Sequence, residues 1–255
     1  MDVLAVPAFQ DNYLWLLHDD ARRAWVVDPG DPAPIEAALE ARGLTLSGVL
    51  ITHHHFDHTG GALQLAEGYG CPIYGPAHSP FEGITDPLED GATLTLGSTS
   101  FTVLTVPGHT LDHIAYYSAE AGLLFCGDTL FAGGCGRMFE GTAPQMHGSL
   151  ARLAALPGDT AVYCAHEYTL ANLRFAKAVE PDNAALLARI EEAEALRAAG
   201  TPTVPTTIAL ERATNPFLRT EAPGVRQALA AQDERLKTAE PSACFAALRS
   251  WKDRF

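Results

Sequence analysis

The sequence is poor in several features that mark particular classes of protein. Its 255 residues include only five cysteines, an odd number, and no two are spaced as C-x-x-C. Cys126 and Cys164 lie inside apolar runs, which favours buried free thiols in a reducing cytoplasm. No stretch approaches the roughly 18 uninterrupted apolar residues of a membrane span, so we expect no membrane association. The first residues lack both a basic segment and a long apolar one, and no secretory signal is expected.

Basic residues are also scarce. The chain has 17 Lys and Arg against 31 Asp and Glu, which gives a formal net charge of −14. Proteins that bind nucleic acids are usually basic, so no nucleic-acid partner is expected. A small anionic substrate would need a local cluster of cations to offset this charge.

Hydrophobic residues make up 47% of the chain, enough for a large core. Strand-like runs interleave with helical patterns up to His166, and we expect mixed sheets covered by helices. Beyond it the chain is rich in Ala, Leu, Arg and Glu. We therefore predict one domain over residues 1–166 and an α-helical subdomain over 167–255. Helices are predicted over 169–179, 183–199, 223–238 and 242–251, and a Pro- and Thr-rich connector over 201–216.

The most unusual stretch is Thr-His-His-His-Phe-Asp-His at 52–58, directly after the apolar run 49–51. In extended backbone His53 and His55 point to the same side and can reach one metal ion, whereas His54 points away. A bend after Phe56 could carry the last two residues of the stretch to a second ion. Imidazole and carboxylate ligands suit zinc, iron and manganese alike.

Three later segments each place one metal-capable side chain after an apolar run and a small residue. They carry His109 in Pro-Gly-His-Thr, Asp128 in Cys-Gly-Asp-Thr and His166 in Cys-Ala-His-Glu. Any one of them alone is weak evidence, because such residues commonly serve in turns. Together with residues 53–58 they indicate a metal centre rather than a solvated histidine-rich loop.

This order of motifs resembles that of the metallo-β-lactamase superfamily. The resemblance implies an α/β fold, an αββα sandwich of two mixed sheets flanked by helices, followed by the C-terminal helical subdomain. It also implies two divalent metal ions, with zinc expected and iron or manganese also suited. The implied ligands are His53, His55 and His109 for the first ion, Asp57, His58 and His166 for the second, and Asp128 bridging both. Asp57 and Asp128 are also the implied catalytic residues.

Within the superfamily, the sequence is similar to the hydroxyacylglutathione hydrolase (glyoxalase II) family. The similarity rests on Gly-Asp-Thr-Leu-Phe from 127, Gly-Cys-Gly-Arg-Met-Phe-Glu-Gly-Thr from 134, His-Glu-Tyr-Thr from 166, and Arg-Ser-Trp-Lys-Asp-Arg-Phe from 249. It implies a cytoplasmic thioester hydrolase that converts S-lactoylglutathione to lactate and glutathione, the second step of methylglyoxal detoxification. A hydroxide held between the ions would attack the thioester carbonyl. We expect a monomer.

The same resemblance implies a glutathione site in the helical part and two loops. Its residues would be Arg137, Phe139, Tyr168, Asn172, Arg249 and Lys252. Lys and Tyr are common in the family where this chain has Arg137 and Phe139. Phe139 lacks a hydroxyl, so we expect weaker or altered recognition of the thiol carrier.

Two other functions are open to a chain with these motifs. One is a mononuclear iron oxidoreductase of the same fold, resembling persulfide dioxygenase, which oxygen uptake with glutathione persulfide would reveal. The other is a metal-binding interaction module without catalysis, which an assay of metal-dependent thioester cleavage would separate from an enzyme.

Overall fold

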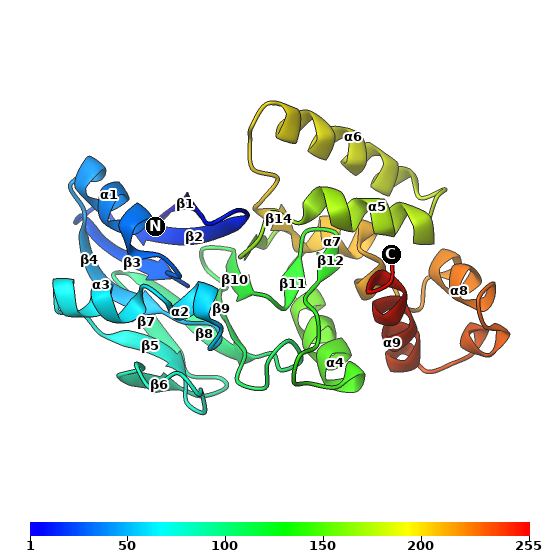
Figure 1. Cartoon of the computed structure of the whole chain (residues 1–255), viewed down its shortest axis with the longest axis horizontal. Coiled ribbons are helices and arrows are strands. Elements are labelled where there is room, and N and C mark those ends of the chain that lie inside the picture. The colour runs from blue at the N-terminus through cyan, green and yellow to red at the C-terminus, as the bar shows by residue number, and fades with distance from the viewer. The chain divides into compact units, whose positions relative to one another are not determined.

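The computed structural model describes residues 1–255, which form two compact units (Figure 1). The first unit comprises Met1–Thr105, Asp112–Gly127 and Tyr163–His166. The second comprises Val106–Leu111, Asp128–Val162 and Glu167–Phe255. The chain therefore passes between the units several times, and two of these crossings directly follow the ends of strands, at Thr105 and Gly127.

The first unit contains a six-stranded mixed sheet. Its order is β1 (Asp2–Ala8), β2 (Asn12–His18), β3 (Arg23–Val27), β4 (Thr45–Leu50), β5 (Ile73–Pro76), β6 (Asp86–Leu88). The first three strands pair antiparallel, and the last four pair parallel. The parallel connections carry the helices α1 (Pro32–Arg42), α2 (Phe56–Thr59) and α3 (Ala62–Tyr69), as parallel pairing requires a crossover.

Helices α1 and α3 cover one face of this sheet (Figure 1). Asp31 caps the start of α1 by accepting from the Ala33 N–H, and Gly43 ends it at a φ of 61°. Ile35 and Leu39 of α1 and Leu65 of α3 are fully buried against the sheet. Burial of this apolar stripe holds the strand ends that carry residues 53–58.

The second sheet contributes four antiparallel strands to the first unit. These are β7 (Thr93–Leu96), β8 (Thr99–Thr105), β9 (Ile114–Ser118) and β10 (Leu123–Gly127). Phe101 and Phe125 are fully buried on it. The buried Tyr116 hydroxyl donates to the Ile51 carbonyl at 2.7 Å, which ties this sheet to the end of β4.

The second unit is mostly helical. Its helices are α4 (Ala143–Ala154), α5 (Thr169–Val179), α6 (Ala184–Ala198), α7 (Ile208–Thr214), α8 (Pro223–Ala230), α9 (Pro241–Lys252) and the 3-10 turns η1 (Pro216–Leu218) and η2 (Glu234–Lys237). A short hairpin joins β11 (Leu130–Phe131) and β12 (Gly134–Cys135). Strand β13 (Ala161–Cys164) pairs antiparallel with β14 (Thr206–Thr207). No helix is both long and apolar enough to cross a membrane.

Two expectations for the helical part were wrong. The segment 201–216 contains β14 and α7, because the Thr207 side chain caps a turn whose Ile208 and Glu211 are fully buried. The helix expected over 223–238 ends at Ala230, since Asp233 adopts an extended conformation and caps the separate turn η2. Both differences depend on tertiary burial and local capping, which hydrophobic periodicity does not register.

Candidate active site

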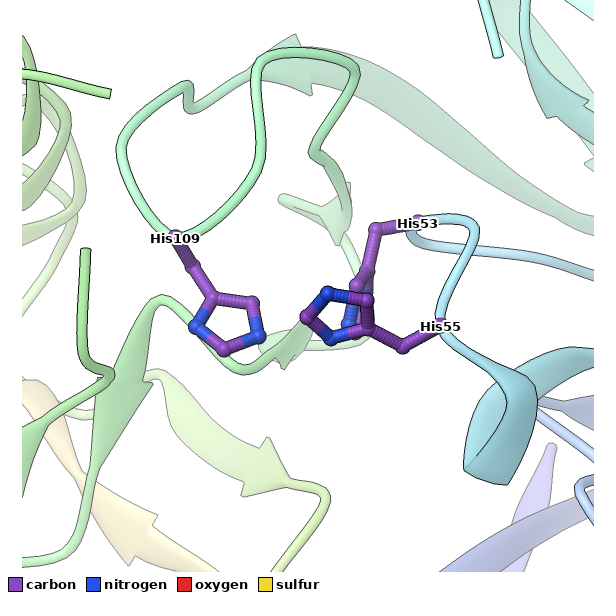
Figure 2. A group of neighbouring side chains, drawn as sticks. All are labelled: His53, His55 and His109. Carbon is purple, nitrogen blue, oxygen red and sulfur yellow. The ribbon is translucent and has the colours of Figure 1, made fainter. Parts of the chain in front are cut away.

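His53 and His55 lie on the loop that follows β4 and turn their rings toward one another (Figure 2). The ring centroids are 4.7 Å apart, and His53 is completely buried. The Nδ1 of His53 is 3.0 Å from the Thr52 hydroxyl, which itself donates to Asp28. His53 Nδ1 therefore donates its proton to Thr52, which leaves the Nε2 lone pair available to a metal ion.

A second group of ligand atoms in the first unit is formed by Asp57, His58 and His166, which lie within 4.8 Å of one another. Asp57 Oδ2 is 3.4 Å from His58 Nε2 and 3.5 Å from His166 Nε2. Two imidazoles and one carboxylate that converge in this way are a donor set that suits a divalent transition metal.

Asp28 is a functional residue that the sequence analysis did not assign. Its carboxylate accepts from the Thr52 N–H and hydroxyl at 2.7 Å each, and it lies 3.0 Å from His58 Nδ1. Asp28 is buried and adopts a positive φ of 53°, a conformation that is rare outside glycine. It thus orients His58 directly and His53 through Thr52. The Asp-Pro-Gly that ends an apolar strand was the available signal.

His54 has a different environment from its neighbours. Its Nδ1 contacts Asp112 Oδ1 at 2.9 Å, and the other Asp112 oxygen accepts from Ser79 at 2.7 Å. The alternation expected for residues 53–55 is therefore present in the side-chain directions. His113, which matched no ligand position, stacks on the His53 ring with centroids 4.6 Å apart.

The second unit contains His109 and Asp128. His109 Nε2 lies 3.4 Å from Asp128 Oδ2, and His109 Nδ1 donates to the Arg137 carbonyl at 2.8 Å. Figure 2 draws His109 on the loop after β8. The carbonyl fixes the imidazole tautomer, so Nε2, the nitrogen that faces Asp128, is the one that can coordinate a metal.

A pocket of about 400 Å³ opens within this second unit. His109 and Asp128 line it, together with Phe131, Cys135, Gly136 and Ala171. The six residues expected to bind glutathione also line it: Arg137, Phe139, Tyr168, Asn172, Arg249 and Lys252. Three cationic side chains thus gather in one pocket of a strongly acidic chain.

The cations differ in how firmly they are held. Arg249 is only 4% exposed, donates to the Cys135 carbonyl at 3.1 Å, and makes two further bonds to Asp253 Oδ1. Lys252 donates to the Ala171 carbonyl at 3.0 Å. Burial, followed by the repulsion of neighbouring arginines, lowers the pKa of Lys252 to about 8. Arg137 is largely exposed, with its Nε 3.8 Å from Asp253.

Phe139 and Asn172 have clear structural contacts as well. The exposed Phe139 ring stands edge-on to His109, with centroids 5.2 Å apart and an interplanar angle of 81°. The buried Asn172 amide donates to the Ala132 carbonyl at 3.1 Å and supports the β11–β12 turn. Burial also raises the pKa of the Cys135 thiol to about 11, so this cysteine is an uncharged wall of the pocket.

Comparison with known proteins places the chain in a family. The model of the hydroxyacylglutathione hydrolase C-terminus matches residues 167–255, and that of the metallo-beta-lactamase superfamily matches residues 9–166. A hydroxyacylglutathione hydrolase of Ectopseudomonas mendocina is 58% identical over 253 residues, 98% of each chain. The chain belongs to the hydroxyacylglutathione hydrolase family. The resemblance inferred from the sequence motifs is therefore confirmed.

Solved structures agree with the fold of this hydroxyacylglutathione hydrolase family member. ETHE1 from Myxococcus xanthus is 25% identical, with a TM-score of 0.68 over 99% of this chain and 98% of that one. TTHA1623, solved in a di-iron-bound form, is 27% identical, with a TM-score of 0.60 over 86% of this chain and all of the other. The fold is the metallo-β-lactamase-like α/β fold predicted from the sequence.

Membership in the hydroxyacylglutathione hydrolase family has two consequences. The chain is an enzyme of the hydrolase class, and the persulfide dioxygenase alternative is not favoured, because the full-length relatives carry the hydrolase name. The superfamily and the clustered histidines and aspartates also imply divalent metal ions.

Proposed function

We propose that the chain hydrolyses S-(2-hydroxyacyl)glutathione thioesters, with S-lactoylglutathione as the representative substrate, to a 2-hydroxy acid and glutathione. One observation carries the proposal. A single pocket of about 400 Å³ is lined both by His109 and Asp128, which can hold a metal ion, and by three cations that can bind carboxylates. A glutathione thioester presents both groups that this pocket would recognise, a reactive carbonyl and remote carboxylates.

We infer a centre of two divalent ions. His53, His55 and His109 would hold the first ion, Asp57, His58 and His166 the second, and Asp128 would bridge them. The donor set fits, since Nδ1 of His53, His58, His109 and His166 has a protein partner and Nε2 is left for coordination. Such ions polarise a carbonyl group and acidify water. Zinc is the proposed metal, and iron and manganese suit the same ligands.

The residues around the pocket have separate tasks. Lys252 and Arg137 would bind the glycine carboxylate of glutathione, and the buried Arg249 would add its charge while it holds the Cys135 carbonyl. The Arg137 carbonyl orients His109, so one short segment supports both the metal ligand and the carboxylate site. The Tyr168 side chain would complete the contacts to the tripeptide.

Departure of the leaving group requires little catalysis by the protein. The thiol of glutathione has a pKa of about 8.5, so the thiolate can depart with little help from a general acid. The ring of Phe139 stands beside His109 and would place apolar surface next to the reacting end of the pocket. Since Phe139 has no hydroxyl, we propose weaker binding of the tripeptide than a tyrosine would give.

The cellular compartment, the oligomeric state and the division into domains are proposed on simpler grounds. None of the five cysteines is in a disulfide, in keeping with the reducing cytoplasm. A monomer remains the prediction, as does the division into a metal domain at 1–166 and a glutathione-binding subdomain at 167–255.

The test is an assay of S-lactoylglutathione cleavage by metal-loaded and chelator-treated protein. The loaded protein should release lactate and glutathione in equal amounts, and the chelated protein should release neither until divalent metal is restored. Thioester cleavage that persists at full rate without metal would refute the proposed centre. Absence of cleavage with full metal content would refute the substrate.

A further inference from the structure

The turn between β1 and β2 is built against the second group of metal ligands. Ala8 pairs with Asn12, so only Phe9, Gln10 and Asp11 form the turn. Phe9 takes a positive φ of 52°, a strained conformation that neighbouring contacts must stabilise. The backbone of Asn12 forms an isolated antiparallel bridge with His166.

Two adjacent side chains of this turn reach two different ligands. Asp11 Oδ1 lies 2.8 Å from His166 Nδ1, and the Asn12 amide donates to Asp57 Oδ2 at 3.1 Å. Asp57 and His166 are far apart in the sequence, yet both belong to the group whose ligand atoms lie within 4.8 Å. Asn12 is buried, which a polar side chain tolerates when its hydrogen bonds are made.

We propose that Asp11 and Asn12 are positioning residues for the second metal ion, a proposal that rests on the two-ion centre inferred above. Asp11 holds His166 with Nδ1 protonated, which points the Nε2 lone pair toward Asp57 and strengthens its electron donation. Asn12 fixes the rotamer of Asp57 through the same oxygen that faces the two imidazoles. Neither the sequence motif nor the ligand set assigns this role to the turn.

The effect should be confined to one ion. His53 is oriented by Thr52 and Asp28, and His58 also contacts Asp28, so these ligands do not depend on the turn. Loss of an outer partner of a ligating histidine typically weakens metal binding by about 10- to 100-fold. Removal of Asp11 should therefore weaken the second ion and spare the first.

The experiment compares wild type with Asp11→Ala, Asp11→Asn and Asn12→Ala, and uses Asp20→Ala as the matched control. Asp20 is an exposed carboxylate in the next turn of the same sheet. Zinc bound per chain is measured by elemental analysis during titration with a competing chelator. The thermal midpoint of the metal-free protein reports any loss of the fold itself.

Wild type and Asp20→Ala should lose two zinc ions in the same chelator range. Asp11→Ala should lose one ion at a chelator concentration about 10- to 100-fold lower than wild type requires. It should keep the other ion over the same range as wild type. Asp11→Asn, whose side-chain oxygen can still accept from His166, should lie between them, and Asn12→Ala should also weaken only one ion. In the same titration, cobalt-substituted Asp11→Ala should lose the visible absorption of only one of its two metal sites.

Other outcomes overturn the proposal. Two ions held by Asp11→Ala as tightly as by wild type would show that the turn does not position His166. Equal weakening of both ions, with a lower midpoint in the metal-free protein, would make the turn a general support of the fold. If wild type itself binds fewer than two ions, the two-ion centre fails instead, so the two failures are distinguishable.

Discussion

Replacement of Lys252 by Met should weaken binding of glutathione thioesters without slowing the chemical step. The Lys252 ammonium has three N–H donors, and one is committed to the Ala171 carbonyl at 3.0 Å. The others can bind a substrate carboxylate, and one charge-assisted hydrogen bond is worth about 1.5–3 kcal/mol. KM should therefore rise about 10- to 150-fold. The contact is alike in ground and transition states, so kcat should change little.

The pH dependence sharpens this prediction. Burial and nearby arginines lower the pKa of Lys252 to about 8, so its charge is complete only well below pH 8. As pH rises through that value the ammonium loses its proton, and substrate affinity should fall with it. One unit above the pKa only about a tenth of the lysine is charged, so KM should be roughly tenfold higher there. The Lys252→Met variant should lack this step.

The assay compares two thioesters at each pH. S-lactoylglutathione carries the glycine carboxylate, and the lactoyl thioester of N-acetylcysteamine does not. The ratio of their kcat/KM values removes any pH effect on the metal centre that both share. Lys177→Met, at an exposed lysine of α5, is the matched control. A ratio that is independent of pH in wild type, or equal in the Lys252 and Lys177 variants, would show that the Lys252 charge does not bind the glycine carboxylate.

Three further predictions test the rest of the site and its support. Asp128→Ala should abolish thioester cleavage and lower bound zinc, because a bridging carboxylate serves both ions; full turnover with two zinc ions would contradict the ligand set. His54→Ala should keep metal content that His53→Ala loses, as measured by elemental analysis, and equal losses would be incompatible with the side-chain directions. Glu211→Ala leaves Arg189 buried without its partner carboxylate. Denaturant unfolding should therefore show a free energy of unfolding that is about 3–5 kcal/mol lower. An unchanged denaturation midpoint would show that this buried ion pair does not stabilise the fold.

The sequence was most informative where chemistry and spacing coincide. Residues 53–58 follow a buried strand, and strict alternation of side chains was enough to separate His53 and His55 from His54. The cations Arg249 and Lys252 were assigned only through the family resemblance. The structure brings both to one pocket, yet Arg249 already bonds Cys135 and Asp253, a detail that spacing along a helix does not reveal.

The residues that orient the metal ligands were harder to predict from the sequence. Asp11 and Asn12 look like an ordinary turn, and their contacts to His166 and Asp57 depend on chain segments that are distant in sequence. Helix α7 was missed for a related reason, because its stability comes from the buried Glu211 rather than from its own short apolar pattern. Contacts between such distant segments can be identified only from the three-dimensional structure.

If this chain cleaves a glutathione thioester with water, an oxygen atom of the solvent must enter the acid product, and isotope transfer measures this directly. Metal-loaded protein is incubated with S-lactoylglutathione in water enriched in oxygen-18. The mass of the lactate is measured by mass spectrometry, and the concentration of dissolved oxygen is recorded during the reaction. We expect lactate that carries one heavy oxygen atom in its carboxylate, an equal amount of free glutathione, and no oxygen uptake. Unlabelled lactate, or oxygen consumption with glutathione persulfide in place of thioester cleavage, would contradict this expectation.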